Sequence, residues 1–143
     1  MRFASAAAVL LFLCGVLLAA GCGKGKSGEA KGPQTVPIRG KVVFTKGGTV
    51  KSLADKQARI EFESVDKPGV RAVGPIEEDG SFVVATITPE GGSPGAIPGK
   101  HRVRIELEDN AQKLVAPQFL DFTKSGLTIS LPSDQPIEIK VFR

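Results

Sequence analysis

The 143-residue chain contains no tryptophan, no tyrosine and a single histidine, His101. Without tyrosine or tryptophan, phenylalanine is the only residue that can supply the aromatic platforms on which many carbohydrate-binding proteins rely. One histidine is too few for a zinc hydrolase, because catalytic zinc takes about three protein ligands, commonly histidine with glutamate. We therefore expect no enzymatic activity, no catalytic residues, no metal site and no cofactor.

Long hydrophobic runs are also absent, except for one at the N-terminus from Ala6 to Ala20. Arg2 precedes this run, and the small residues Ala20-Gly21 and Cys22 follow it. The run is shorter than the ~20 apolar residues that a membrane-spanning helix needs. A basic start, an apolar stretch and a small-residue cleavage site predict a secretory signal peptide over residues 1–21.

The cysteine directly after the small residues makes this junction resemble the lipobox of bacterial lipoproteins. The resemblance implies that Cys22 is the lipidation site: its thiol takes a diacylglyceryl group, and its new amine is acylated, for example with palmitate. The sequence departs from the family at Ala19, where most lipoboxes carry leucine. Plain secretion and a retained, uncleaved anchor are the alternatives. Cleavage would also remove Cys14, leaving no partner for a disulfide within the chain.

We accordingly expect a lipid-anchored protein of the cell envelope. Gly23 follows the cysteine where an aspartate would retain some lipoproteins at the inner membrane, so we expect the outer membrane, with the protein facing the periplasm or the cell surface. Residues 22–35 combine the lipidated cysteine with a glycine- and lysine-rich segment that has no large apolar side chain to bury, which predicts a flexible tether. The sequence pI is near 9.2, but basic and acidic residues alternate, and we expect no nucleic-acid partner.

From residue 36 onward the hydrophobic period is two, which is typical of half-buried antiparallel strands. Seven runs show it, at 38–44, 58–63, 70–76, 81–87, 102–108, 127–131 and 137–141. The spacing predicts an all-β fold, a single antiparallel Greek-key β-sandwich of about seven strands over residues 36–143. Asp79-Gly80 predicts a hairpin between the third and fourth runs. No window after the signal predicts an amphipathic helix, and the glycine-rich stretch 91–95 predicts a surface loop.

Parity within the runs assigns side chains to the two faces of a strand. Phe62 shares the inward parity, whereas Glu61 falls on the outward parity, where substitution by alanine is expected to change stability by no more than ~0.5 kcal/mol. His101 points inward at the start of a run, which favours a structural role with a hydrogen bond to backbone. As a catalytic base it would need a nucleophile and an orienting partner, and the sequence places neither.

Several motifs, taken in order, are similar to the carboxypeptidase regulatory-like (transthyretin-like) β-sandwich, and most closely to small bacterial lipoproteins built from one such domain. These motifs are Val36–Phe44 with Gly40, Glu78-Asp79-Gly80-Ser81-Phe82, Pro94–Val103, and Pro117–Asp121 followed by Ser125-Gly126-Leu127. The chain departs from the family at His101, where relatives usually have tyrosine. The resemblance implies an accessory, adhesive or ligand-binding module without peptidase activity.

The expected function is therefore a non-catalytic, lipid-anchored envelope protein that is structural or binds a protein partner. A module that binds a glycan or a small molecule is the alternative, and a small hydrolase is a third. Segments 89–99 and 110–125 are the least strand-like parts of the domain. Phe119 and Phe122 lie in the second of them, and we expect these two residues to be the apolar anchors for a partner.

Overall fold

The structure is a computed structural model that describes residues 33–89 and 91–143. The expected signal peptide and most of the expected tether, including Cys22, lie outside these residues. Strands dominate the described chain, with one short α-helix and two 3₁₀ segments. The elements are β1 (Arg39–Lys46), α1 (Val50–Ala54), β2 (Arg59–Ser64), β3 (Arg71–Pro75), β4 (Ser81–Val83), β5 (Ala85–Thr88), β6 (Gly91–Pro94), β7 (Gly99–Glu106), η1 (Asp109–Leu114), η2 (Pro117–Leu120), β8 (Thr128–Leu131) and β9 (Ile137–Phe142).

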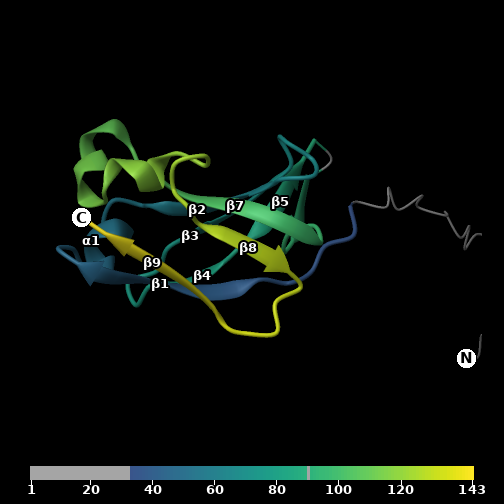
Figure 1. Cartoon of the computed structure of the whole chain (residues 1–143), viewed down its shortest axis with the longest axis horizontal. Coiled ribbons are helices and arrows are strands. Elements are labelled where there is room, and N and C mark those ends of the chain that lie inside the picture. The colour runs from purple at the N-terminus through teal and green to yellow at the C-terminus, as the bar shows by residue number, and fades with distance from the viewer. Residues whose placement is uncertain (1–32, 90) are drawn as a thin grey trace, which may run out of the picture.

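The strands form two layers, as Figure 1 shows. The small sheet has the order β4-β1-β9, and the large sheet has the order β6-β5-β3-β2-β7-β8. In the large sheet β7 returns past β6, β5 and β3 to pair with β2, which is the return connection of a Greek key. All pairs are antiparallel except β1 with β9, which run parallel from Gly40↔Ile137 onward. The expected all-β sandwich is confirmed.

Each of the seven expected runs contains a strand, and two further strands come from the fourth run and its surroundings. The run 81–87 divides at Val84 into β4, which joins the small sheet, and β5, which joins the large sheet. The stretch 91–95, expected to be a loop, instead contains β6, which pairs with β5. That expectation was wrong because backbone hydrogen bonds along an edge need no hydrophobic side chains, and glycines can make them.

The expected hairpin at Asp79-Gly80 is present but short: Glu77 accepts a hydrogen bond of 2.9 Å from the Gly80 N–H and donates one of 2.9 Å to the Ser81 carbonyl, and the chain then passes from the large sheet to the small one. The Asp79 carboxylate accepts a hydrogen bond of 2.9 Å from the N–H of Ser81, and Gly80 has a φ of +88°. The pairing of the flanking segments ends at the bridge Ile76↔Phe82, because β4 pairs with β1 instead of with β3. A Cβ atom at Gly80 would clash with the carbonyl oxygen of Val42.

A short helix, α1, lies where the sequence predicted none. Thr49 caps it by accepting a hydrogen bond of 3.4 Å from the N–H of Ser52, and Leu53 is fully buried against the sandwich. Five residues make less than two turns, so a 3.6-residue period has no room to appear in the sequence.

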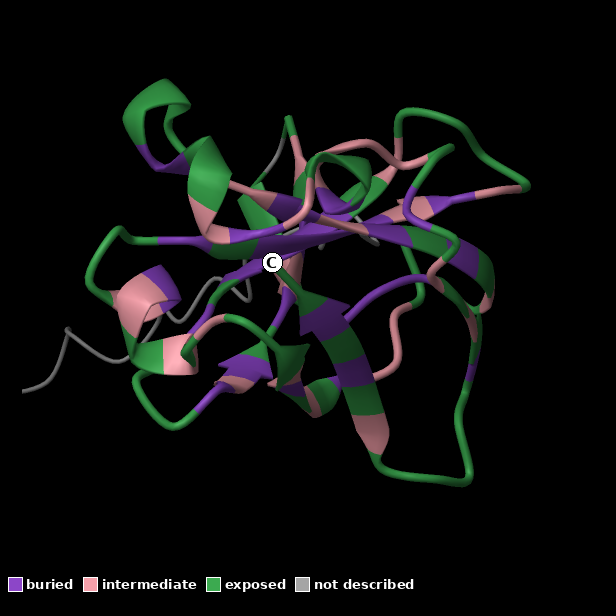
Figure 2. Cartoon of the chain, turned by 60° about the vertical axis from the view of Figure 1, so that its left-hand side comes forward, coloured by how far each residue is buried: buried purple, intermediate pink, exposed green. Residues whose placement is uncertain are grey.

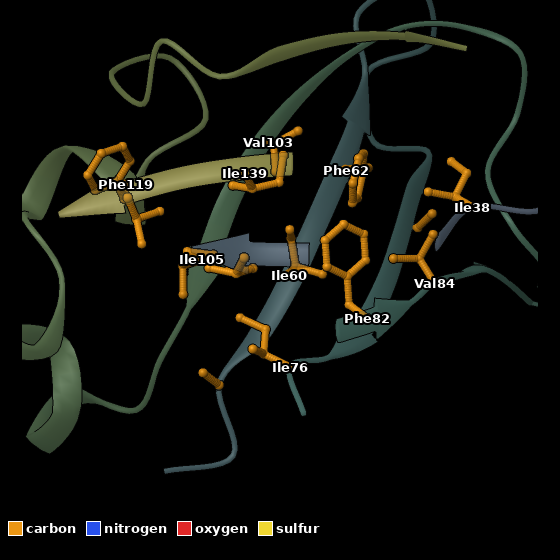
Figure 3. Packing of buried hydrophobic residues seen from close by; sticks show 14 of the residues in the cluster. Ile38, Ile60, Phe62, Ile76, Phe82, Val84, Val103, Ile105, Phe119 and Ile139 are labelled. Atoms are coloured by element: carbon orange, nitrogen blue, oxygen red, sulfur yellow. The ribbon is translucent and has the colours of Figure 1, made fainter. Parts of the chain in front are cut away.

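The core lies between the two sheets and follows the predicted parity. Phe62 of β2 and Phe82 of β4 face each other across it, with ring centroids 5.9 Å apart. Figure 3 shows them packed with Ile60, Val103 and Ile105 of the large sheet and with Ile139 of the small sheet. Figure 2 shows the matching alternation of buried and exposed residues along β9. The inward position of Phe62 is confirmed.

The sandwich has two distinct ends. At the first, which we call the tether end, Val36 pairs with Ala96 through two backbone hydrogen bonds of 2.8 and 3.0 Å. The loop 65–70 and the loop 132–136 belong to the same end, because Val65 bonds to Lys100, and Leu131 pairs with Gly99. At the other, the far end, lie α1, η1, η2 and the C-terminus (Figure 1).

Candidate functional site

The loop that follows η2 is held in shape by one carboxylate. Asp121 accepts hydrogen bonds from the Thr123 N–H at 2.8 Å, the Thr123 hydroxyl at 2.6 Å and the Lys124 N–H at 3.1 Å. The hydrogen bonds from Thr123, followed by the smaller effect of Lys124, hold the pKa of Asp121 below its ordinary value. Phe122 sits inside this turn, so these hydrogen bonds fix its backbone position.

The Phe122 ring lies over the outer face of the large sheet, between two arginines. The guanidinium carbon of Arg104 is 4.7 Å from the ring centroid, and that of Arg71 is 5.2 Å away. Both distances are within the range of cation–π attraction, which contributes about 0.5–1 kcal/mol for each exposed pair. We call Phe122, Arg71, Arg104 and the two glutamates that bind these arginines the Phe122 cluster.

The two glutamates come from β2, between the strands that carry the arginines. Glu61 lies directly opposite Arg104 of β7 and accepts a hydrogen bond of 2.6 Å from its Nε. Glu63 lies opposite Arg71 of β3 and receives hydrogen bonds of 3.3 and 3.2 Å from its Nε and Nη2. The strand register thus places each arginine opposite a glutamate. Each guanidinium is held by a carboxylate on one side and by the Phe122 ring on the other.

Glu61 is only 5 % exposed, although it faces outward as its parity predicted. It lies under the Arg104 guanidinium, over which the Phe122 ring stacks. The expectation of a nearly neutral Glu61 substitution is therefore wrong. Sequence parity assigns a face to a side chain, but it gives no sign that a segment sixty residues further along the chain covers that face.

The structure separates the two predicted anchors. Phe119 of η2 is 3 % exposed and packs edge-on against Phe142, with ring centroids 5.0 Å apart. It belongs to the core and would have to leave it to contact a partner. Phe122 is half-buried and reaches the surface. Only Phe122 therefore remains as a surface anchor.

His101 lies inside the sandwich at the start of β7, as its parity predicted. It is 1 % exposed, its Nδ1 lies 3.2 Å from the carbonyl oxygen of Gly99, and its ring packs edge-on against Phe62. Burial lowers the pKa of His101, an effect that the hydrogen bond to Gly99 and the charge of Asp66 oppose. The ring therefore favours its neutral form.

Most of the cluster consists of four charged residues that sequence reasoning did not single out as site residues: Arg71, Arg104, Glu61 and Glu63. Their alternation of charge is visible in each strand, but the pairing of β2 with both β3 and β7 is not. Only the strand register brings the opposite charges side by side.

Across residues 33–89 and 91–143, no group of three histidine, cysteine, aspartate or glutamate side chains is placed to hold a metal ion. Within the same ranges, no helix has the length and apolar character to cross a membrane. In comparisons with known proteins, no family model, no curated protein and no solved structure matches this chain.

Proposed function

We propose that this protein is a lipid-anchored, non-catalytic β-sandwich of the cell envelope, which binds a protein partner through the Phe122 cluster. The observation that carries the proposal is the position of the Phe122 ring, held between two guanidiniums on a turn that Asp121 has already ordered. The anchor rests on the lipobox resemblance at Cys22, and the outer membrane is the proposed location.

The composition of the cluster matches that of binding surfaces. Aromatic residues and arginine are enriched where proteins contact one another, and they supply a large share of the binding energy. The side chains of Arg71 and Arg104 keep 43 % and 27 % of their surface exposed, so they retain free N–H groups for a partner's carboxylates or carbonyls. Because their carboxylate partners already hold them in place, little side-chain entropy is lost on binding.

We also propose that the domain is a carboxypeptidase regulatory-like sandwich. Two glycines of the resembling motifs lie at points where the fold admits no other residue. A Cβ at Gly40 would clash with the Phe82 ring and the Ile137 carbonyl, and one at Gly95 would clash with the carbonyl of Val36. These clashes explain why the two motifs carry glycine at positions 40 and 95, which supports the resemblance.

Glycan or small-molecule binding is the alternative function. A wide-open hollow of about 450 Å³ lies at the far end, between residues 54–59 and 75–78. No aromatic side chain lines it, so it lacks the stacking surface on which a sugar ring would pack. This geometry favours the protein partner over the glycan.

In-cell photocrosslinking tests the proposal. A photoreactive residue at Thr123, which is exposed beside Phe122, should capture an envelope protein, while the same probe at Glu138 on the small sheet should capture much less. Adding Phe122→Ala to the Thr123 probe should reduce capture at least about tenfold, because a central aromatic anchor is lost. Circular dichroism should show that this variant stays folded.

Three outcomes would overturn the proposal. Equal capture at positions 123 and 138 would remove the Phe122 cluster as the binding surface. Specific retention on a glycan array would favour the alternative function. Turnover of a substrate by the purified protein, abolished by His101→Ala, would make the protein an enzyme.

A further inference from the structure

We infer that the tether end of the sandwich is a docking surface for anionic phospholipid headgroups. The inference rests on the proposed lipid anchor, and it adds a second, protein-mediated contact with the same membrane. The residues that carry it are Lys67, Lys100 and Arg102, with Arg39 on the small sheet at the same end.

Chain connectivity places this end next to the membrane. The chain is pinned to the sandwich at Val36, whose N–H and carbonyl both bond to Ala96. Thirteen residues separate a lipidated Cys22 from Val36, and the tether that their composition predicts would span roughly 20 Å. The far end is at least one strand length further away, since β1 alone has eight residues, or roughly 26 Å.

Three cations gather at this end of the large sheet. Lys100 and Arg102 alternate with buried residues along β7, so both project from its outer face. The loop with Lys67 adjoins them, because the Val65 N–H bonds to the Lys100 carbonyl at 2.8 Å. All three side chains are exposed, and in the part of the chain that the structure describes none of them makes an ion pair.

Arg39 continues the positive surface onto the small sheet. It lines a shallow hollow with the segment 131–137, which follows the Leu131–Gly99 pair. The acidic residues near these cations are Asp66, Asp134 and Glu63; the Asp66 carboxylate is directed toward Gly99 and His101, and Glu63, opposite Arg102, pairs with Arg71. The exposed charge is therefore mainly positive.

Several cationic residues elsewhere in the domain are paired, whereas Lys46, Lys56 and Lys113 at the far end make no ion pair among the described residues. On the outer face of the large sheet Arg59, Arg71 and Arg104 each pair with a glutamate. At the far end Lys51 is held between Asp55 and Glu78, at 2.8 and 3.4 Å. Unpaired cations at the membrane-proximal end match an anionic lipid surface, to which each contributes attraction within about a Debye length.

Vesicle sedimentation with the mature chain carrying Cys22→Ser tests the inference without any lipid anchor. The probes are vesicles of phosphatidylcholine alone and of phosphatidylcholine with about 30 % phosphatidylglycerol. The chain should bind only the anionic vesicles and should dissociate from them at about 1 M salt. The triple variant Lys67→Gln, Lys100→Gln, Arg102→Gln should bind on the order of 100-fold more weakly, since each cation contributes roughly fivefold.

A matched control removes the same charge from the far end. Lys46→Gln, Lys56→Gln, Lys113→Gln changes three exposed lysines and leaves the tether lysines intact, so its binding should stay within about threefold of the parent chain. Equal losses in both triple variants, or no loss in the first, would overturn the inference. Circular dichroism of each variant shows that the fold is intact. A failure of the proposed lipid anchor would appear in a different experiment, as absent lipid labelling of the wild-type protein, and would be distinguishable from a failure of this inference.

Discussion

The pair of Glu61 and Arg104 shows how a charged residue becomes part of the buried structure of a sandwich. Its hydrogen bond of 2.6 Å lies on the outer face of the large sheet, beneath the Phe122 ring. A buried carboxylate that loses its partner, or a guanidinium that loses its carboxylate, leaves an unsatisfied charge, which is strongly destabilising. The pair therefore fixes both the stability of this face and the position of Arg104 for binding.

Glu61→Gln should lower the free energy of unfolding by about 1–3 kcal/mol, because it removes the charge from a nearly buried, charge-assisted hydrogen bond. Urea denaturation measures the change. The control is Glu106→Gln, whose side chain is 41 % exposed and lies 3.9 Å from Arg59; its effect should stay within about 0.5 kcal/mol. Equal effects at the two positions would contradict the burial of Glu61 under the cluster.

His101 should make stability depend on pH. Because burial lowers its pKa in the folded state, protons bind more readily to the unfolded chain, whose histidine has a pKa near 6.5. The stabilisation is complete above about pH 6.5 and is lost as the pH falls toward the lower folded-state pKa. Thermal unfolding at about pH 7.5 and about pH 5.5 should show the loss in the wild type.

His101→Gln is the control for this pH dependence and should show a much flatter profile. The pKa values of Asp79 and Asp121 are lowered from the ordinary value of 3.8, so these carboxyls do not titrate in the same range. An unchanged profile in the variant would show that His101 is not the titrating group.

At the scale of the elements, the sequence predicted strands well and their partners poorly. Alternation located all seven expected strands, since a half-buried strand imposes its period locally. It could not show that 81–87 divides at Val84 between two sheets, because sheet membership depends on distant segments. The sequence placed Phe122 in a loop segment. It could not show that Arg71, Arg104 and Glu61 surround this residue, because their positions also depend on distant segments. The five residues of α1 were too few to show a helical period.

The corner at Gly80 offers a matched test of the fold. Gly80 and Gly126 both have a positive φ, at +88° and +69°, but a Cβ at Gly80 would meet the Val42 carbonyl, whereas one at Gly126 would meet nothing within 4 Å. Gly126→Ala should cost about 1–2 kcal/mol from backbone strain alone. Gly80→Ala should cost clearly more, as measured by urea denaturation. Equal costs would show that β4 does not cross between the sheets at this corner.

At the scale of the whole molecule, the two proposed surfaces adjoin, because Arg102 lies directly opposite Glu63 of the Phe122 cluster. The tether end carries unpaired cations and adjoins the segment that leads to Cys22. The Phe122 cluster lies on the outer face of the large sheet, from which Lys100 and Arg102 also project. In the proposed arrangement, one small domain would hold a partner beside the membrane that anchors it.

Both proposals depend on the anchor, so metabolic labelling with a radioactive fatty acid is the most direct test of the account. Wild-type protein should incorporate the label and fractionate with the membrane, because acyl chains on Cys22 bury many methylene groups in the bilayer. Cys22→Ala should incorporate none, and it should be released or accumulate as the uncleaved precursor. The account is contradicted if the wild type takes up no label, or if the variant takes up as much as the wild type.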